Sequence, residues 1–161
     1  TPWSNGNVYW DAGNQSGYDR INAAATSAQT EGQWNYWTFE KNVATGTMTI
    51  FLNGVQWLNG TGKTKPIGSI DHFKIGQGNW SGSQSYAGNI DEFAVWDTVL
   101  PLAVIQQYMY KDLDATHPFA SHLKLYMHNN DGNNFTETFN SFGFPALNTL
   151  STVLHSRPIC P

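Results

Sequence analysis

The most regular alternation of hydrophobic and polar residues in the chain runs over residues 47–53. The hydrophobic positions on one side of this run are Met48, Ile50 and Leu52. Because successive side chains of a strand point to opposite faces, this spacing predicts a β-strand with one buried face. The pair Asn53-Gly54 follows directly, and residues 55–58 continue as a second strand-like run. Both residues of the pair tolerate a positive φ, so the sequence predicts a tight hairpin.

Three further runs have the composition of strands, over residues 34–41, 70–75 and 89–96. Aromatic and aliphatic residues recur in them at alternate positions, which favours strands buried on one face. The residues of these runs that we expect to point into the core are Trp37, Phe39, Phe73, Ile75, Phe93 and Val95. Trp34 and Trp96 also lie in the runs and are predicted core residues. The pattern therefore predicts an all-β fold in which two antiparallel sheets pack face to face.

A single short helix is predicted near residues 101–110. Thr98 is a candidate N-cap, and Pro101 suits a first helical position because its fixed φ is already helical. The hydrophobic residues that follow at helical spacing are Leu102, Ile105 and Met109. This spacing predicts one buried helix face.

The composition excludes several classes of function. Only 12% of the 161 residues are charged and 14% are aromatic, which fits short strands and polar turns better than a helical bundle. The net charge is -4 and basic residues form no run, so the electrostatic footprint of a nucleic-acid binder is missing. No hydrophobic stretch approaches the roughly 18 residues of a membrane span. The single cysteine, Cys160, cannot form an internal disulfide, so the fold must rest on its core.

Four sequence motifs follow one another along the chain. They are a Gly-x-Trp strand at residues 32–37, an Asn-Gly hairpin at residues 46–55, an Ile-Gly strand end at residues 74–76, and an Ile-Asp-Glu strand at residues 86–100. In this order they resemble the motifs of laminin G-like and pentraxin-like domains, which belong to the concanavalin A-like jelly rolls. The last motif is the most specific. The resemblance implies an antiparallel two-sheet jelly-roll sandwich.

Domains of this group mostly bind glycans, glycoproteins or other proteins, often as one unit of a long adhesive chain. The resemblance therefore implies an extracellular, secreted or cell-surface module that recognises a glycan or glycoprotein. It also implies a fragment of a large multidomain bacterial surface protein, with neighbouring modules of the same chain as further partners. The alternatives are a glycan-cleaving jelly-roll enzyme and a structural spacer without a ligand. Asp91 and Glu92 are adjacent in a predicted strand and would point to opposite faces, so we expect no enzyme activity.

Calcium is the cofactor that the resemblance suggests. Many sandwiches of this group hold a structural calcium ion with the Asp of the Ile-Asp-Glu motif, which is Asp91 here. Asp91 shares a predicted strand face with Phe93 and Val95, so its charge requires either a metal ion or backbone N–H donors. A second acidic loop could bind calcium at the rim, as in pentraxins and laminin modules, although turn chemistry explains it equally well. The candidate ligands of that loop are Asp11, Asn14 and Asp19.

The candidate ligand-binding site is the loop around Trp80 and Tyr86. Its polar neighbours are Gln77, Asn79 and Gln84. An aromatic ring there can stack on a sugar while the amides form hydrogen bonds with its hydroxyl groups. The alternative is that Trp80 covers one end of the sandwich as part of the core.

The chain is predicted to begin and end at different points of the fold from those of a single domain of this group. Residues 1–114 resemble a laminin G-like jelly roll that lacks its usual first strand or strands. Residues 115–161 resemble a linker and the opening strand of a following or permuted module, with the strand itself at residues 123–128. This strand could complete the sandwich in cis, as in a circular permutation, or in a neighbouring copy. An unrelated C-terminal hairpin is the alternative.

Overall fold

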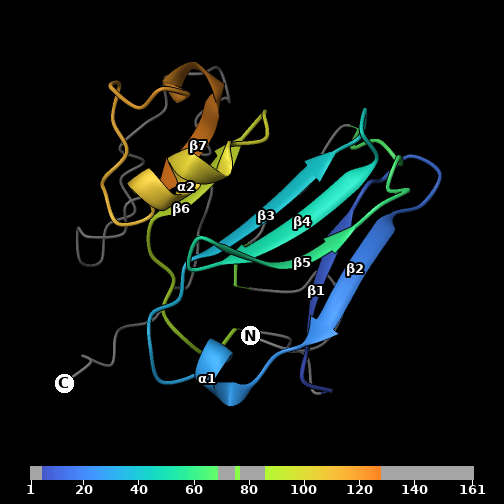
Figure 1. Ribbon diagram of the computed structural model, residues 1–161, viewed down its shortest axis with the longest axis horizontal. Coiled ribbons are helices and arrows are strands. Elements are labelled where there is room, and N and C mark those ends of the chain that lie inside the picture. Colours follow the sequence, from blue (N-terminus) through green and yellow to red (C-terminus); the bar gives the residue numbers. More distant parts are fainter. Residues whose placement is uncertain (1–4, 69–74, 77–85, 128–161) are drawn as a thin grey trace. The chain divides into compact units, whose positions relative to one another are not determined.

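A computed structural model of the chain describes residues 5–68, 75–76 and 86–127. The chain divides into two compact units, Thr1–Ala87 with Pro101–Met109 and Gly88–Leu100 with Tyr110–Pro161. The strand pairs of both units are antiparallel, and the helices are short (Figure 1). The predicted all-β fold class is therefore confirmed in the described part of the chain.

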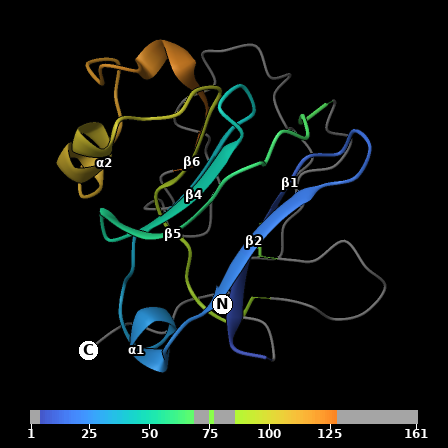
Figure 2. The same ribbon diagram turned by 45° about the vertical axis from the view of Figure 1, so that its right-hand side comes forward.

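The first unit contains a two-stranded ribbon and a three-stranded sheet. The ribbon consists of β1 (Asn7–Ala12) and β2 (Asp19–Ala24). The sheet consists of β3 (Trp37–Asn42), β4 (Thr47–Leu52) and β5 (Val55–Gly60), with β4 in the centre. The helices of this unit are α1 (Ser27–Thr30) and α2 (Leu102–Tyr108). Strand β2 contacts β5, and the ribbon runs alongside that strand in Figure 1 and Figure 2.

The predicted hairpin connects β4 to β5. Asn53 and Gly54 have φ values of 52° and 72°, the left-handed conformation that an Asn-Gly pair tolerates. A β-bulge between the two strands leaves Trp57 outside the pairing register. The ring of Trp57 packs edge-on against Trp37, with the ring centroids 5.3 Å apart. The hairpin and the inward position of Trp37 therefore agree with the sequence pattern.

The core of the first unit lies between the ribbon and the sheet. Its buried residues are Ala12, Ile21, Met48 and Ile50, and the half-buried residues packed against them are Trp10, Trp37, Trp57 and Leu58. Met48 and Ile50 are 0% exposed, as the alternation predicted. Leu52 and Ile75 are half-buried. Phe73, the other core residue predicted for this part of the chain, lies outside the described residues.

Three aromatic residues of this unit depart from the predicted pattern. Trp34 was expected in the core, but it lies in the loop before β3 and is 60% exposed. Phe39 is on the inward face of β3 and still 39% exposed. Phe51 shares the opposite face of β4 with polar residues, yet it is only 7% exposed. The central strand β4 is therefore buried on both faces, which simple alternation does not reveal.

Helix α2 begins later than predicted. Pro101 occupies the N-cap position, so the predicted cap at Thr98 is wrong. Ile105 is 3% exposed and anchors the buried side of the helix, whereas Leu102 is 40% exposed. The side chain of Gln106 donates to the carbonyl of Gly54 at 2.8 Å. The helix is therefore attached to the β4–β5 turn.

The second unit is built on β6 (Phe93–Trp96) and β7 (Leu123–Met127), with a 3₁₀ helix (Ala120–His122) before β7. Leu123 and Tyr126 are 1% and 2% exposed. The Tyr126 hydroxyl donates to the Glu92 carboxylate, and burial raises the pKa of this phenol. Tyr126 therefore stays protonated and acts as a donor. Phe93 and Val95, which were predicted to lie in the core, are half-buried, as are the other residues of β6.

The strand predicted at residues 123–128 is present over its described part, Leu123–Met127, and pairs within the same chain. Strand β7 lies antiparallel to β6, from the pair Phe93–Met127 to the pair Trp96–Leu123. Strand β6 directly follows the Ile-Asp-Glu motif, which occupies residues 90–92. The division into a module at residues 1–114 and a second one from residue 115 remains a prediction.

Candidate functional site

The outer face of the β1–β2 ribbon gathers aromatic and charged side chains. Alternation turns Trp10 toward the core, so its neighbours Tyr9 and Asp11 point outward. The register places Arg20 opposite Asp11, on the same outer face. Tyr18, immediately before β2, is 51% exposed. We call Tyr9, Asp11, Tyr18 and Arg20 the tyrosine–arginine face.

Arg20 is the centre of this face. Its Nε and one terminal nitrogen donate to the two carboxylate oxygens of Asp11, each at 2.6 Å. Its guanidinium carbon lies 4.7 Å from the ring centroid of Tyr9 and 5.2 Å from that of Tyr18. The side chains of Arg20 and Asp11 are 43% and 37% exposed, so water screens the pair and it adds little to stability. The hydrogen bonds that Arg20 donates to Asp11 raise the pKa of Arg20, and the pair presents a planar set of donors and acceptors at the surface.

The Tyr9 hydroxyl is held by two amide side chains. Asn5 Nδ2 donates to it at 2.7 Å and Asn7 Nδ2 at 3.4 Å. Asn5 Oδ1 also accepts the backbone N–H of Asn7 at 3.1 Å, which fixes the turn that enters β1. The hydrogen bonds from Asn5 and Asn7 lower the pKa of Tyr9. The orientation of the Tyr9 ring is therefore set by hydrogen bonds within the protein.

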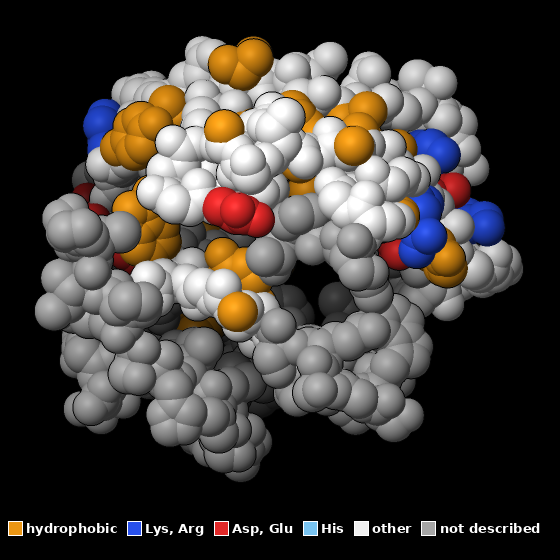
Figure 3. Space-filling model, turned by 90° about the horizontal axis from the view of Figure 1, so that it is seen from below, with side chains coloured by type: hydrophobic (Ala, Val, Ile, Leu, Met, Phe, Trp, Pro, Cys, Tyr) orange, Lys and Arg blue, Asp and Glu red, His pale blue; other side chains and the backbone are white. Residues whose placement is uncertain are grey.

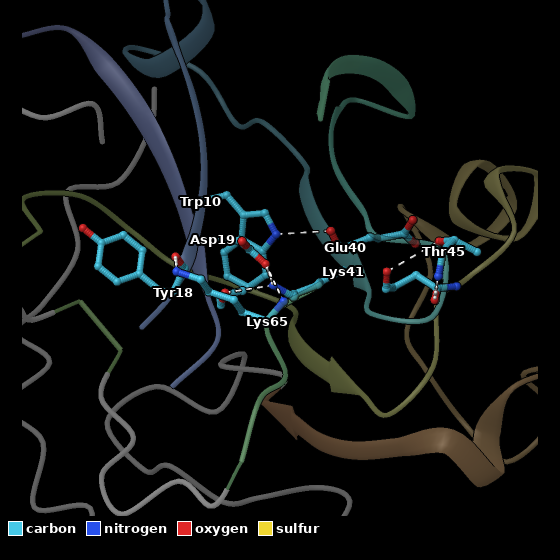
Figure 4. A network of polar contacts seen from close by, with 9 residues as sticks. Trp10, Tyr18, Asp19, Glu40, Lys41, Thr45 and Lys65 are labelled. Carbon is cyan, nitrogen blue, oxygen red and sulfur yellow. Dashed lines mark hydrogen bonds and ion pairs between the residues drawn. The ribbon is translucent and has the colours of Figure 1, made fainter. Parts of the chain in front are cut away.

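An ion pair ties this ribbon to the sheet behind it (Figure 4). Lys41 Nζ lies 2.7 Å from Asp19 Oδ2 and donates to the Ala12 carbonyl at 2.9 Å. The same Asp19 oxygen accepts the Lys65 N–H at 2.8 Å, and Lys65 Nζ donates to the Tyr18 carbonyl at 3.2 Å. The side chains of Lys41 and Asp19 are only 2% and 11% exposed. The hydrogen bond from Lys41 lowers the pKa of Asp19, so the carboxylate stays charged and both ends of the ribbon turn are fixed.

The predicted rim calcium ligands are not brought together. Ala12, not Asp11, is the register partner of Asp19, so the side chains of Asp11 and Asp19 point to opposite faces of the ribbon. Asn14 Oδ1 accepts the backbone N–H of Gly68 at 2.5 Å. Within the described ranges, no group of three or more His, Cys, Asp and Glu side chains is arranged to hold a metal ion. The contacts of these residues given above are ion pairs and turn hydrogen bonds, and a rim calcium ion remains a prediction.

The predicted calcium ligand Asp91 is exposed. Glu92, the next residue, has a φ of 50°, so the alternation of β6 does not extend back to Asp91. The expectation that Asp91 and Glu92 are neighbours in one strand is therefore wrong. The absence of enzyme activity, which was argued from that expectation, remains a prediction. The Asp91 carboxylate accepts the Glu92 backbone N–H at 3.0 Å, which is the hydrogen-bonded alternative. Among the described residues, Asp91 is not part of any group of three or more His, Cys, Asp and Glu side chains, and calcium there remains a prediction.

The predicted ligand-binding loop falls mostly outside the described residues. These residues are Gln77, Asn79, Trp80 and Gln84. Tyr86 is described and is half-buried, and its backbone N–H donates to the Gly76 carbonyl at 2.7 Å. A sugar-stacking role for this loop remains a prediction.

The sequence did not single out Tyr18 and Arg20 as candidates. Residues 19–24 contain one large hydrophobic residue, Ile21, so their alternation was too weak to predict a strand. Once β2 is paired with β1, the register brings Arg20 to Asp11 and the site becomes visible. The basic, acidic and hydrophobic side chains are interspersed on the side of the molecule where the ribbon turn lies, at the right in Figure 3.

Comparisons with known proteins bear on the fold. No curated protein matches the chain. A crystal structure of residues 221–444 of an S-layer domain-containing protein from Clostridium thermocellum is similar with a TM-score of 0.42 and 21% identity over 63% of this chain. The chain spans about half of that structure, namely 51%. In the described part of the chain, none of the helices has the length and hydrophobicity to cross a lipid bilayer.

One family model matches a continuous region that includes β1 to β5. It describes the concanavalin A-like lectin/glucanases superfamily and matches residues 2–106. This region contains the four motifs on which the resemblance rested, and the antiparallel strands agree with the fold that they imply. The chain therefore belongs to the concanavalin A-like lectin/glucanase superfamily.

Proposed function

We propose that this chain is an extracellular binding and adhesion module that recognises a glycan or glycoprotein and does not cleave it. The observation that carries the proposal is the tyrosine–arginine face. Two tyrosine rings there flank an exposed guanidinium–carboxylate pair. Tyrosine and arginine are the residue types enriched at the energetic centres of binding surfaces.

The chemistry of this face complements a sugar. A sugar ring has apolar C–H faces and a rim of hydroxyl groups. The rings of Tyr9 and Tyr18 offer flat apolar area, and their hydroxyl groups offer polar contacts. The Arg20–Asp11 pair presents several N–H donors beside carboxylate acceptors, an arrangement that can bond neighbouring hydroxyl groups. Such a site orients a polar ligand without requiring a deep apolar cavity.

The site is held in place before binding. The buried Lys41–Asp19 pair fixes the ribbon to the sheet, and Lys65 fixes the backbone at Tyr18. A preorganised surface loses less conformational entropy when it binds, which raises the affinity that a small contact area can give. Individual sites of this size bind weakly, so we expect neighbouring modules of the parent chain to contribute through avidity. The proposal places the protein outside the cell, secreted or at the surface, where such glycans are displayed.

A printed glycan array probed with the whole chain tests the proposal. The wild type should bind a defined set of oligosaccharides, and Tyr18→Ala and Arg20→Ala should each weaken that binding about fivefold or more, the effect of losing roughly 1 kcal/mol at a hot spot. Tyr110→Ala is the matched control, because Tyr110 is 78% exposed and lies in the other unit. Loss of binding by the control as well, or unchanged binding by both site variants, would count against this face.

The two alternatives predict different results. A glycan-cleaving enzyme would release reducing sugars from the bound oligosaccharides over time, whereas a binding module leaves them intact. A structural spacer would bind none of the printed glycans. The same preparation of the protein serves for both measurements.

A further inference from the structure

Trp34 stands out among the described tryptophan side chains. It is 60% exposed, although tryptophan is on average one of the more buried residue types. It lies in the loop between α1 and β3, and its sequence neighbours are Gln33 and Asn35. An indole left in water exposes a large apolar surface, which a ligand can cover.

The backbone that carries Trp34 is fixed from both sides. After it, Asn35 Nδ2 donates to the Gln29 carbonyl at 3.0 Å, and Asn35 Oδ1 accepts from Asn53 Nδ2 at 3.0 Å. Asn53 also accepts the Tyr36 N–H at 2.8 Å through its side chain and donates its own N–H to the Tyr36 carbonyl at 2.8 Å. The loop is therefore tied to the β4–β5 turn.

Before Trp34, the chain is held by α1. The Gln33 side chain donates to the Ala28 carbonyl. Thr26 and Gln29 form a capping box at the start of this helix, which stabilises a helix of only one turn. Because both flanks of Trp34 are anchored, the indole is displayed on a rigid support, and little entropy is lost when a ligand covers it.

The surroundings of Trp34 favour a sugar over a protein surface. Its loop neighbours Glu31, Gln33 and Asn35 are polar, and each amide has more donor and acceptor positions than the contacts above use. The core of a protein–protein interface is apolar and aromatic, whereas both chain neighbours of Trp34 carry amide side chains. A flat apolar face beside amide groups matches one face of a sugar ring with its hydroxyl rim. Glu31 lies three residues before Trp34, and the whole chain has a net charge of -4. Both disfavour an anionic sugar, so we take the ligand class to be an uncharged pyranose.

We infer that Trp34 is a second sugar-binding position, distinct from the tyrosine–arginine face, that stacks on an uncharged pyranose ring. The inference rests on the proposed glycan-binding function and adds a contact residue and a ligand class to it. Both positions belong to the first unit, so one oligosaccharide or two branches of a glycan could engage both.

The test uses the whole chain and a printed array of neutral and anionic oligosaccharides. The expected result is that wild type binds uncharged oligosaccharides, that Trp34→Ala weakens this binding at least fivefold, and that Trp34→Phe keeps part of it. Val55→Ala is the matched control, because Val55 is 66% exposed on β5 and is not part of the loop. Circular dichroism melting verifies that each variant is folded.

Heteronuclear NMR gives a direct readout that does not depend on the alanine variant. The indole N–H resonance of Trp34 is identified by its loss in Trp34→Phe. Titration with the uncharged oligosaccharide that binds best on the array should shift this resonance. If wild type binds glycans through Tyr18 and Arg20 but Trp34→Ala binds equally well and the indole resonance does not move, the inference is wrong and the proposed function stands. If wild type binds no printed glycan, both are wrong.

Discussion

The packing of β2 on β5 leaves no room for a side chain at Gly60. A Cβ atom there would lie 2.6 Å from Ile21 Cγ2 and 3.2 Å from Lys63 Cε. Lys63 ends in a flexible chain and can move, but Ile21 is 7% exposed and belongs to the core. Overpacking of a core by one methyl group costs about 1–3 kcal/mol. Gly60→Ala should therefore lower Tm by roughly 2–12 °C in a chain of this size.

A double-mutant cycle with Ile21→Leu isolates this contact. Leucine has no methyl branch at Cβ, so the substitution removes Cγ2 while it conserves volume, and alone it should cost less than about 1.5 kcal/mol. With the methyl gone, Gly60→Ala should be tolerated, and the double variant should be more stable than the sum of the single effects by about 1 kcal/mol. Urea unfolding followed by circular dichroism measures each free energy, and Asn59→Ala, exposed on the same strand, is the control. Additive effects, or a fully stable Gly60→Ala variant, would refute the described packing of the ribbon on the sheet.

Three further predictions concern charge, backbone and metal. Lys41 holds the pKa of Asp19 below its ordinary value of 3.8. The stability that this pair contributes is therefore present above that pH and is lost as the pH falls through the lowered pKa. The difference in Tm between wild type and Lys41→Met should therefore become smaller in acid. Gly54→Ala should cost about 1–2 kcal/mol in thermal melts, because Gly54 has a φ of 72° and a side chain there would lie 3.1 Å from Met109 Sδ. If Asp91 holds calcium, a chelator should lower the Tm of the wild type and have no effect on the Tm of Asp91→Asn. If the wild type melts at the same temperature with and without chelator, only the hydrogen bond of Asp91 to the backbone remains.

The regular strands were predictable because local sequence determines them. Alternation and the Asn53-Gly54 pair define the β4–β5 hairpin without any knowledge of distant residues, and its core residues Met48 and Ile50 are buried as expected. The order of four short motifs then identified the superfamily. Burial of Phe51 was not predictable, because what covers the second face of a central strand depends on elements far away in the sequence.

The candidate site was less predictable, because pairing across strands creates it. The sequence predicts Asp11 as a candidate calcium ligand in an acidic loop, but its partner Arg20 follows only from the register of β1 with β2. Trp34 was assigned to a strand because aromatic residues favour strands, yet the hydrogen bonds of Asn35 with Asn53 hold that segment as a loop. Asp91 was assigned to a strand face by extrapolating β6 backwards, and a single positive φ at Glu92 ends the alternation.

The pairing of β7 with β6 shows what can and cannot be predicted when a segment resembles the first strand of a module. Such similarity indicates which sheet position a segment suits, since its hydrophobic pattern fits one neighbour and one face. It does not indicate which copy of a module supplies the strand. In this chain Leu123 and Tyr126 are buried within the same unit as β6, so the segment supplies core residues to its own chain. The segment of chain between β6 and β7 keeps the two strands together at an effective concentration on the order of millimolar. A second copy of the chain could therefore displace β7 from β6 only at very high protein concentration or in a tandem array.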